Sequence, residues 1–133
     1  MPKFTLSELQ AIRGRQKFYQ LVVDGQCLFD AFWQEIEREG NLVAELRRIL
    51  AIMDQVAQLK QPLPQNVFRE LQGRKKSDHV KEYEVKTSNL RVYLFHEEGT
   101  GKIVVCGGKK NTQEADIKRF RSLKKQYFEA KPD

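Results

Sequence analysis

The stretch from Tyr83 to Tyr127, YEVKTSNLRVYLFHEEGTGKIVVCGGKKNTQEADIKRFRSLKKQY, decides the fold. Apolar and polar side chains alternate over residues 83–87 and again over residues 90–96, a pattern typical of β-strands. Ser88–Asn89 separates the two runs, and a two-residue loop is the commonest connection of a β-hairpin. The sequence therefore predicts an antiparallel hairpin here.

The two faces of this hairpin differ in chemistry. Its register sets Lys86 opposite Arg91 and Glu84 opposite Tyr93 on one face. Two cations directly opposed across a ladder repel by roughly 1 kcal/mol or less, which indicates an anion such as a phosphate between them. Two solvated side chains are the alternative. The other face carries Tyr83, Val85, Leu90, Val92 and Leu94.

After the hairpin, the sequence predicts a third strand and a closing helix. The strand covers Lys102–Cys106 and continues through two glycines to the pair Lys109–Lys110. Asn111 and Glu114 are spaced as a helix cap, and the helix extends to about Phe128. Its apolar stripe is Ile117, Phe120, Leu123 and Tyr127, and its remaining faces carry Lys118, Arg119, Arg121, Lys124 and Lys125.

The N-terminal half predicts one strand and a pair of helices. Lys17–Val23 is apolar at nearly every position, which favours an interior strand covered on both faces. Apolar residues then recur at helical spacing over Leu28–Glu39 and over Leu42–Lys60, with Gly40–Asn41 between them. This connection is short enough for an αα-hairpin. A further helical turn is expected around residues 67–71.

Length and charge limit the class of protein. A chain of 133 residues is long enough for one core, so we expect one domain over residues 17–133 and an N-terminal extension over residues 1–16. In the extension, Thr5 and Glu8 have the spacing of a capping box and predict a short helix. The net charge of +6 favours nucleic acid, an anionic membrane or an acidic protein as partner.

Neither a secretory signal nor a metal site is predicted. The first ten residues lack the apolar run of a signal peptide, so we expect a cytoplasmic protein. Cys27 and Cys106 both lie in apolar surroundings, without a second cysteine or histidine at metal-ligand spacing. They are expected to be reduced core residues, and no cofactor is predicted.

A dense basic segment precedes the hairpin. Residues 74–81 carry four lysines and arginines, and like charges in a block repel one another and gain from a polyanion. A solvated loop is the alternative. Together with cations that follow the last strand and lie on the closing helix, the predicted RNA-binding residues are Arg74, Lys75, Lys76, Lys81, Lys109, Lys118 and Arg121.

The order of strand, helical hairpin, three-strand meander and closing helix resembles the RelE/ParE superfamily of bacterial toxins, in its HigB-like branch. The resemblance is carried by Tyr83–Glu84–Val85–Lys86, Leu90–Arg91–Val92–Tyr93–Leu94–Phe95, Lys102–Ile103–Val104–Val105 and Gly108–Lys109–Lys110 followed by Thr112–Gln113. It covers roughly residues 17–130. It implies an α+β fold, a small RelE-like domain with a twisted, mainly antiparallel sheet of about four strands. An N-terminal αα-hairpin would lie on one face, a basic helix at the C-terminus, and a concave basic face would stay open.

The resemblance also implies an activity. RelE-like members cut messenger RNA in the ribosomal A site, so this chain would be a ribosome-dependent endoribonuclease and the toxin of a type II toxin–antitoxin pair. The ribose 2′-OH attacks the adjacent phosphorus, and cations rather than a metal ion stabilise the added charge. Lys86, Arg91 and Lys110 fall on catalytic cationic positions of the family.

The proton-transfer groups differ from the family pattern. Glu84 stands where RelE proteins have a lysine, and Asp116 lies near the register of their tyrosine. Glu84 as the base beside Lys86, and Tyr93 as a stacking or proton-donating group, are our hypotheses. The alternative for Glu84 and Tyr93 is an ordinary cross-strand surface contact.

The implied partners are messenger RNA, the ribosome and a cognate antitoxin, which is typically a small helix-turn-helix protein. Binding to a membrane is not expected. Two other functions stay open: inhibition of DNA gyrase, as in ParE proteins, and RNA binding without catalysis through the same face. A metal-dependent nuclease is disfavoured, because no pair of carboxylates lies with a histidine at ligand spacing.

Overall fold

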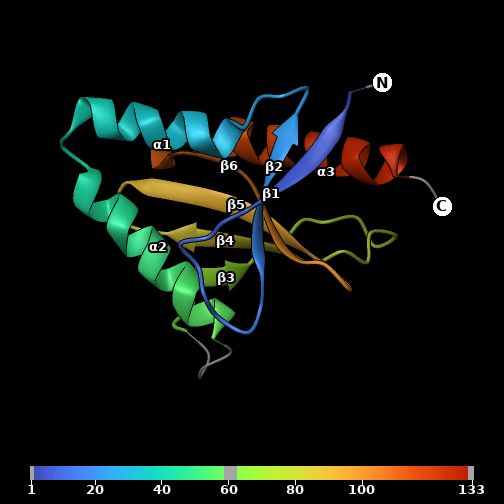
Figure 1. Cartoon of the computed structure of the whole chain (residues 1–133), viewed down its shortest axis with the longest axis horizontal. Coiled ribbons are helices and arrows are strands. Elements are labelled where there is room, and N and C mark those ends of the chain that lie inside the picture. The colour runs from blue at the N-terminus through green and yellow to red at the C-terminus, as the bar shows by residue number, and fades with distance from the viewer. Residues whose placement is uncertain (1, 59–62, 132–133) are drawn as a thin grey trace.

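The computed structural model describes residues 2–58 and 63–131 and shows a six-stranded mixed sheet with three α-helices (Figure 1). In chain order the elements are β1 (Phe4–Glu8), β2 (Phe18–Val23), α1 (Leu28–Glu39), α2 (Val43–Ala57), β3 (Phe68–Glu70), β4 (Glu82–Lys86), β5 (Leu90–Glu97), β6 (Gly101–Lys109), the short 3₁₀ helix η1 (Lys110–Thr112) and α3 (Gln113–Ala130). The strand order is β1-β2-β6-β5-β4-β3. β2 and β6 are parallel, and all other neighbours are antiparallel.

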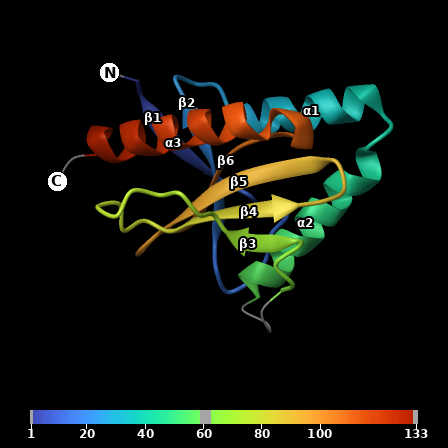
Figure 2. The same cartoon turned by 180° about the vertical axis from the view of Figure 1, so that it is seen from behind.

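Helices cover both faces of this sheet. α1 and α2 pack on one face, and α3 lies across the other, as the opposite view shows (Figure 2). β5 demonstrates the division, because Val92 and Leu94 belong to the core under α1 and α2 whereas Tyr93 and Phe95 belong to the core under α3. Successive side chains of a strand point to opposite faces, so a sheet covered on both sides buries nearly every residue of its central strands.

The prediction of the central hairpin is confirmed. Lys86 pairs with Arg91 and Glu84 with Tyr93, and the backbone N–H of Thr87 donates to the carbonyl of Leu90 at 3.1 Å across the turn. β2 lies between β1 and β6, as its apolar sequence predicted. α1 has the predicted bounds, and the predicted end of the next helix at Lys60 lies outside the described residues.

The predicted fold class, a four-strand RelE-like sheet with an N-terminal helical hairpin, is wrong in three respects. The sheet has six strands and is mixed, and two strands precede the helices. The N-terminal segment forms β1 rather than a short helix, because Phe4 and Leu6 alternate with polar residues and pack on the core under α3. The expected helical turn near residue 68 is β3, whose Phe68 stacks on Tyr83 with ring centroids 5.2 Å apart.

The expected open basic face is also wrong, because α3 covers it. The side chains on this face are mainly large and apolar, including Tyr93, Phe95 and Ile103, and they bury Phe120 and Tyr127 of α3. Burial of an apolar side chain of this size contributes about 1.5–3 kcal/mol, so an uncovered face would be unfavourable. α3 also begins differently from the prediction, with Thr112 rather than Asn111 at its N-cap position and no capping hydrogen bond from that side chain.

Candidate functional site

The β4–β5 turn gathers three of the predicted catalytic cations. Lys86 and Arg91 are directly opposed at the end of the hairpin, and the backbone N–H of Lys110 donates to the carbonyl of Asn89 at 2.9 Å. Lys110 is exposed and Lys86 is half-buried. The end of β6, the hairpin turn and the first residues before α3 therefore meet at one end of the sheet.

Glu45 of α2 fixes this turn from the other face. Its carboxylate accepts hydrogen bonds from the Thr87 hydroxyl, from the Asn89 backbone N–H at 2.9 Å and from the Asn89 amide at 2.8 Å. Partial burial opposes ionisation of Glu45, but these hydrogen bonds outweigh it and lower its pKa. The turn that carries the cations is thus held by an ionised carboxylate.

Arg91 uses its charge within the turn. It is only 9 % exposed, and its Nη1 donates to the carbonyls of Thr87 and Leu90 at 2.7 and 2.8 Å. Its Nε is buried and has no partner among the described residues. The two carbonyl dipoles stabilise the positive charge of Arg91. The position of Arg91 opposite Lys86 in the strand pair therefore does not by itself require a bound phosphate.

Glu84 and Tyr93 lie beneath α3, not on a surface. Both are fully buried, and Glu84 forms an ion pair with Arg69 of β3 at 3.0 Å and accepts from the Gln113 amide at 3.2 Å. The Tyr93 hydroxyl has no partner among the described residues. Burial raises the pKa of Tyr93, and the nearby carboxylates of Glu84 and Asp116 raise it further. Neither side chain reaches a substrate in this arrangement.

Asp116 and the double glycine complete the buried polar cluster. Asp116 accepts from the Thr112 hydroxyl at 2.7 Å and lies against Gly108, where an added Cβ would approach its Oδ2 to 2.0 Å. On the opposite face, a Cβ on Gly107 would lie 2.7 Å from the Phe32 ring of α1. The two glycines therefore allow α1 and the start of α3 to approach β6 from both sides.

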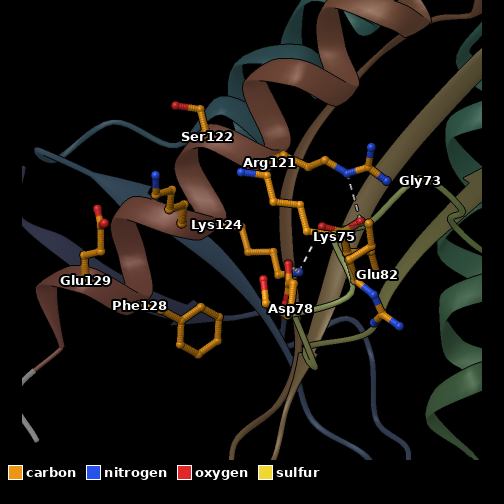
Figure 3. Close-up of a pocket in the computed structure, with 12 residues that line it drawn as sticks. Gly73, Lys75, Asp78, Glu82, Arg121, Ser122, Lys124, Phe128 and Glu129 are labelled. Carbon is orange, nitrogen blue, oxygen red and sulfur yellow. Dashed lines mark hydrogen bonds and ion pairs between the residues drawn. The ribbon is translucent and has the colours of Figure 1, made fainter.

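A second region of interest is an open cleft between residues 73–78 and the C-terminal half of α3 (Figure 3). We call it the α3 cleft; its volume is about 780 Å³, and the cations that line it are Arg74, Lys75, Arg121, Lys124 and Lys125. Phe128 and Glu129 lie at the end nearest the C-terminus (Figure 3).

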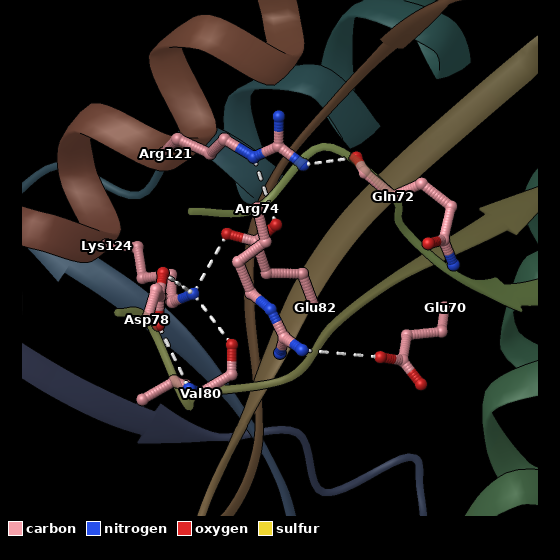
Figure 4. A network of polar contacts seen from close by, with 8 residues as sticks. All are labelled: Glu70, Gln72, Arg74, Asp78, Val80, Glu82, Arg121 and Lys124. Atoms are coloured by element: carbon pink, nitrogen blue, oxygen red, sulfur yellow. Dashed lines mark hydrogen bonds and ion pairs between the residues drawn. The ribbon is translucent and has the colours of Figure 1, made fainter. Parts of the chain in front are cut away.

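The floor of the α3 cleft is a closed network of charges (Figure 4). Lys124, only 3 % exposed, contacts Asp78 at 2.7 Å, Glu82 at 2.9 Å and the Val80 carbonyl at 2.8 Å. Arg121 pairs with Glu82 at 3.0 Å and donates to the Gln72 carbonyl at 2.7 Å. The expectation that Lys124 lies on a face of the helix away from the apolar stripe is therefore wrong.

The predicted RNA-binding residues divide into groups. Arg74, Lys75 and Arg121 line the α3 cleft, and Lys76 lines a smaller hollow of about 260 Å³ that shares Arg74 and Lys75 with the cleft. The remaining ones are dispersed: Lys81 and Lys118 are exposed elsewhere, and Lys109 pairs with Glu39 of α1 at 2.8 Å. The hydrogen bond to Glu39 raises the pKa of Lys109.

Lys102 is a buried cation that the sequence analysis did not single out. It is 7 % exposed, its Nζ lies 3.0 Å from Nδ1 of His96, and it lies 5.1 Å from the centre of the Tyr83 ring. Burial lowers its pKa to about 8, and burial together with the charge of Lys102 lowers the pKa of His96. The alternation of β6 carried a signal, because Lys102 is two residues before the core residue Val104.

The predicted core position is confirmed for Cys106 and only in part for Cys27. Both are free, and Cys106 is buried, which raises the pKa of its thiol to about 12. Cys27 is half-buried at the start of α1, where its sulfur accepts from the Asp30 backbone N–H at 3.4 Å. Over residues 2–58 and 63–131, no group of three or more His, Cys, Asp or Glu side chains is arranged to hold a metal ion.

Comparison with known proteins gives no match to a family model, to a curated protein or to a solved structure. The resemblance to RelE/HigB toxins rests on the residues quoted above. In the part of the chain that the structure describes, none of the helices combines the length and apolar character that crossing a membrane requires.

Proposed function

We propose that the protein is the toxin of a type II toxin–antitoxin pair and acts as an endoribonuclease on messenger RNA at the ribosome. The observation that carries the proposal is the convergence of Lys86, Arg91 and Lys110 at the β4–β5 turn from three segments of the chain. A cluster of cations at one fixed position is what stabilises the extra negative charge of a phosphoryl transition state.

The chemistry assigns different roles to the exposed and the buried members of this region. The 2′-OH of a ribose gives up its proton and attacks the adjacent phosphorus, and a 2′,3′-cyclic phosphate forms. The bond from phosphorus to the 5′-oxygen breaks, and this oxygen takes a proton from solvent and leaves as a 5′-hydroxyl. Lys86 and Lys110 contact the phosphate, and Lys86 is the candidate to accept the 2′-OH proton, for which it must be in its neutral amine form. Arg91 holds the turn in shape and adds positive potential. Glu84 and Tyr93 act as positioning residues, because α3 buries them.

A partner follows from the same proposal. The antitoxin is an acidic protein that neutralises the basic surface, since a net charge of +6 favours association with a surface of opposite sign. Its binding would be expected to weaken with salt.

The test is induced expression in bacteria of the wild type and a Lys86→Gln/Lys110→Gln double variant. An Arg47→Gln/Arg48→Gln variant, with the same change in charge at exposed positions of α2, is the control. We expect growth arrest and new 5′ ends within messenger RNA reading frames for the wild type and the control, and neither for the double variant. Arrest without new RNA ends would overturn the nuclease and direct attention to gyrase, which a plasmid supercoiling assay reports.

RNA binding without catalysis is a second candidate, favoured by one observation. Glu84 and Tyr93, the predicted acid–base groups, are fully buried and do not face solvent. This function predicts binding that falls steeply with salt and leaves the RNA intact. Prolonged incubation of ribosome-bound messenger RNA with purified protein separates it from the nuclease.

A further inference from the structure

The rim of the α3 cleft carries positive charge that the fold does not neutralise. Lys75 and Lys125 are exposed, and neither has a carboxylate at ion-pair distance among the described residues. Glu129 on the same rim offsets one of these charges. By contrast, the acids of the floor, Asp78 and Glu82, are already paired with Lys124 and Arg121. An anion that enters the cleft therefore meets cations first.

Arg74 adds a donor that lacks an acceptor. Its Nη2 lies 3.6 Å from Glu70, which is a loose ion pair, and its Nη1 is enclosed without any partner among the described residues. A guanidinium offers five N–H donors in a planar fork that matches the oxygens of a phosphate. Because Nη1 is enclosed, Arg74 adds positive potential to the wall of the cleft rather than a direct contact to a ligand.

Phe128 makes the cleft suited to a nucleotide. Its ring packs on Phe95 and Tyr127 at centroid distances of 5.4 and 5.1 Å, and it also lines the cleft (Figure 3). Basic walls combined with an aromatic platform are the general device for binding single-stranded nucleic acid. The volume of about 780 Å³ is in the range of ligand pockets.

We propose that the α3 cleft binds a nucleotide of single-stranded RNA, with a phosphate between Lys75 and Lys125 and a base against Phe128. This inference rests on the proposed action on RNA. From the start of α3 at Gln113 to Lys125 the helix rises about 18 Å, the length of about five stacked nucleotides at ~3.4 Å each. One strand can therefore occupy both the β4–β5 turn and the α3 cleft.

The first test measures binding of a short, unstructured, fluorescently labelled oligoribonucleotide by anisotropy, without ribosomes. A Lys75→Glu/Lys125→Glu variant is compared with Arg47→Glu/Arg48→Glu, which makes the same charge change at exposed positions of α2 on the other face. We expect about tenfold or greater weakening for the cleft variant, with a salt slope smaller by ~0.7 for each lost phosphate contact. Equal weakening in both variants would mean that net charge alone attracts RNA, and would overturn the site.

A second variant tests the base. Phe128→Leu preserves an apolar contact with Phe95 and removes the ring face. We expect affinity for the oligoribonucleotide to fall about fivefold or more, with no change for an abasic oligomer of equal length. If the Phe128→Leu variant binds the RNA with wild-type affinity, the proposal that a base stacks on Phe128 is contradicted.

The same variants separate this inference from the proposed function. If the Lys75→Glu/Lys125→Glu variant binds RNA as the wild type does but loses binding of an acidic peptide, the cleft is a protein-binding site and the RNA inference fails, whatever the cleavage assay gives. If the wild type arrests growth and cuts messenger RNA while cleft variants bind and cut equally well, the nuclease stands and the cleft is not part of it. If the wild type cuts nothing but the cleft variants lose RNA binding, the nuclease fails and the cleft stands.

Discussion

The β4–β5 turn and the α3 cleft both gather arginine, lysine and glutamate, but they differ in which charges remain unpaired. At the turn, Arg91 donates to carbonyls of its own hairpin and Glu84 is shared by Arg69 and Gln113 beneath α3. In the cleft, the floor is paired in the same way, whereas Lys75 and Lys125 at the rim have no carboxylate at ion-pair distance among the described residues. A dense set of charges in a sequence therefore identifies a region, whereas tertiary pairing decides which of them can meet a ligand.

The largest expected effect comes from breaking the floor of the α3 cleft. Glu82 is buried and pairs with both Lys124 and Arg121, so Glu82→Gln leaves a buried lysine with less compensation. We expect a loss of about 3 kcal/mol in the free energy of unfolding, because breaking a buried ion pair leaves an uncompensated charge. Urea unfolding followed by circular dichroism measures it.

Glu70→Gln is the matched control for this comparison. Glu70, the last residue of β3, pairs with Arg74 four residues later at 3.6 Å on a partly exposed surface. Surface pairs contribute about 0–1 kcal/mol, so its loss is expected to be small. Similar losses of unfolding free energy for Glu70→Gln and Glu82→Gln would contradict a structural role for the floor. They would indicate that the charges of the floor are as solvated as those of the surface.

Lys102 extends the comparison to a buried cation without a carboxylate at ion-pair distance in the described part of the chain. Its pKa of about 8 lies below its ordinary value of 10.5, so between these two pH values the unfolded chain binds more protons than the folded protein. Stability from this group therefore rises with pH through that window and is lowest below pH 8. Lys102→Met is expected to raise the free energy of unfolding at neutral pH by about 2 kcal/mol, a fraction of the full shift.

The pH profile provides the control for Lys102. Unfolding free energies of the wild type and Lys102→Met, measured from pH 7 to 10.5, are expected to converge as the wild type loses its proton. A Lys17→Met variant, at an exposed position, is expected to keep a constant offset from the wild type. A constant offset for Lys102→Met as well would show that its ammonium is not destabilised by burial.

Much of the fold was predictable from periodicity, and the errors have physical reasons. The alternation from Tyr83 to His96 predicted the hairpin and its register. It did so because the two sides of each strand face two different cores, one on each face of the sheet. β1 was missed although Phe4 and Leu6 alternate with polar residues, because the spacing of Thr5 and Glu8 favoured a helix cap there. β3 was missed because a strand of three residues gains most of its stability from pairing with its neighbour. Whether a neighbour is present is a property of the fold, not of the segment.

The buried polar groups carried a signal that the sequence analysis did not use. Asp116 and Lys124 lie four residues before and after Phe120, and so share the apolar stripe of α3 by helical spacing. Lys124 was placed with the basic residues of the helix and Asp116 was only compared with the family's tyrosine, although the period that placed Phe120 in the core places both of them there too. What no pattern supplied was their partners, since Gly108, Asp78 and Glu82 come from distant parts of the chain.

The smallest expected effect separates two buried tyrosines under α3. The Tyr127 hydroxyl donates to Glu97 at 3.0 Å, whereas the Tyr93 hydroxyl has no partner among the described residues. Tyr127→Phe is expected to lower the free energy of unfolding by about 1 kcal/mol through loss of a hydrogen bond. Tyr93→Phe is expected to raise it by about 1 kcal/mol, because an unsatisfied polar group leaves the core. The test is that the two changes in unfolding free energy have opposite signs. Destabilisation by Tyr93→Phe would mean that water or a moving side chain forms a hydrogen bond with the Tyr93 hydroxyl. The cluster under α3 would then be more open than the contacts of Glu84 and Arg91 imply.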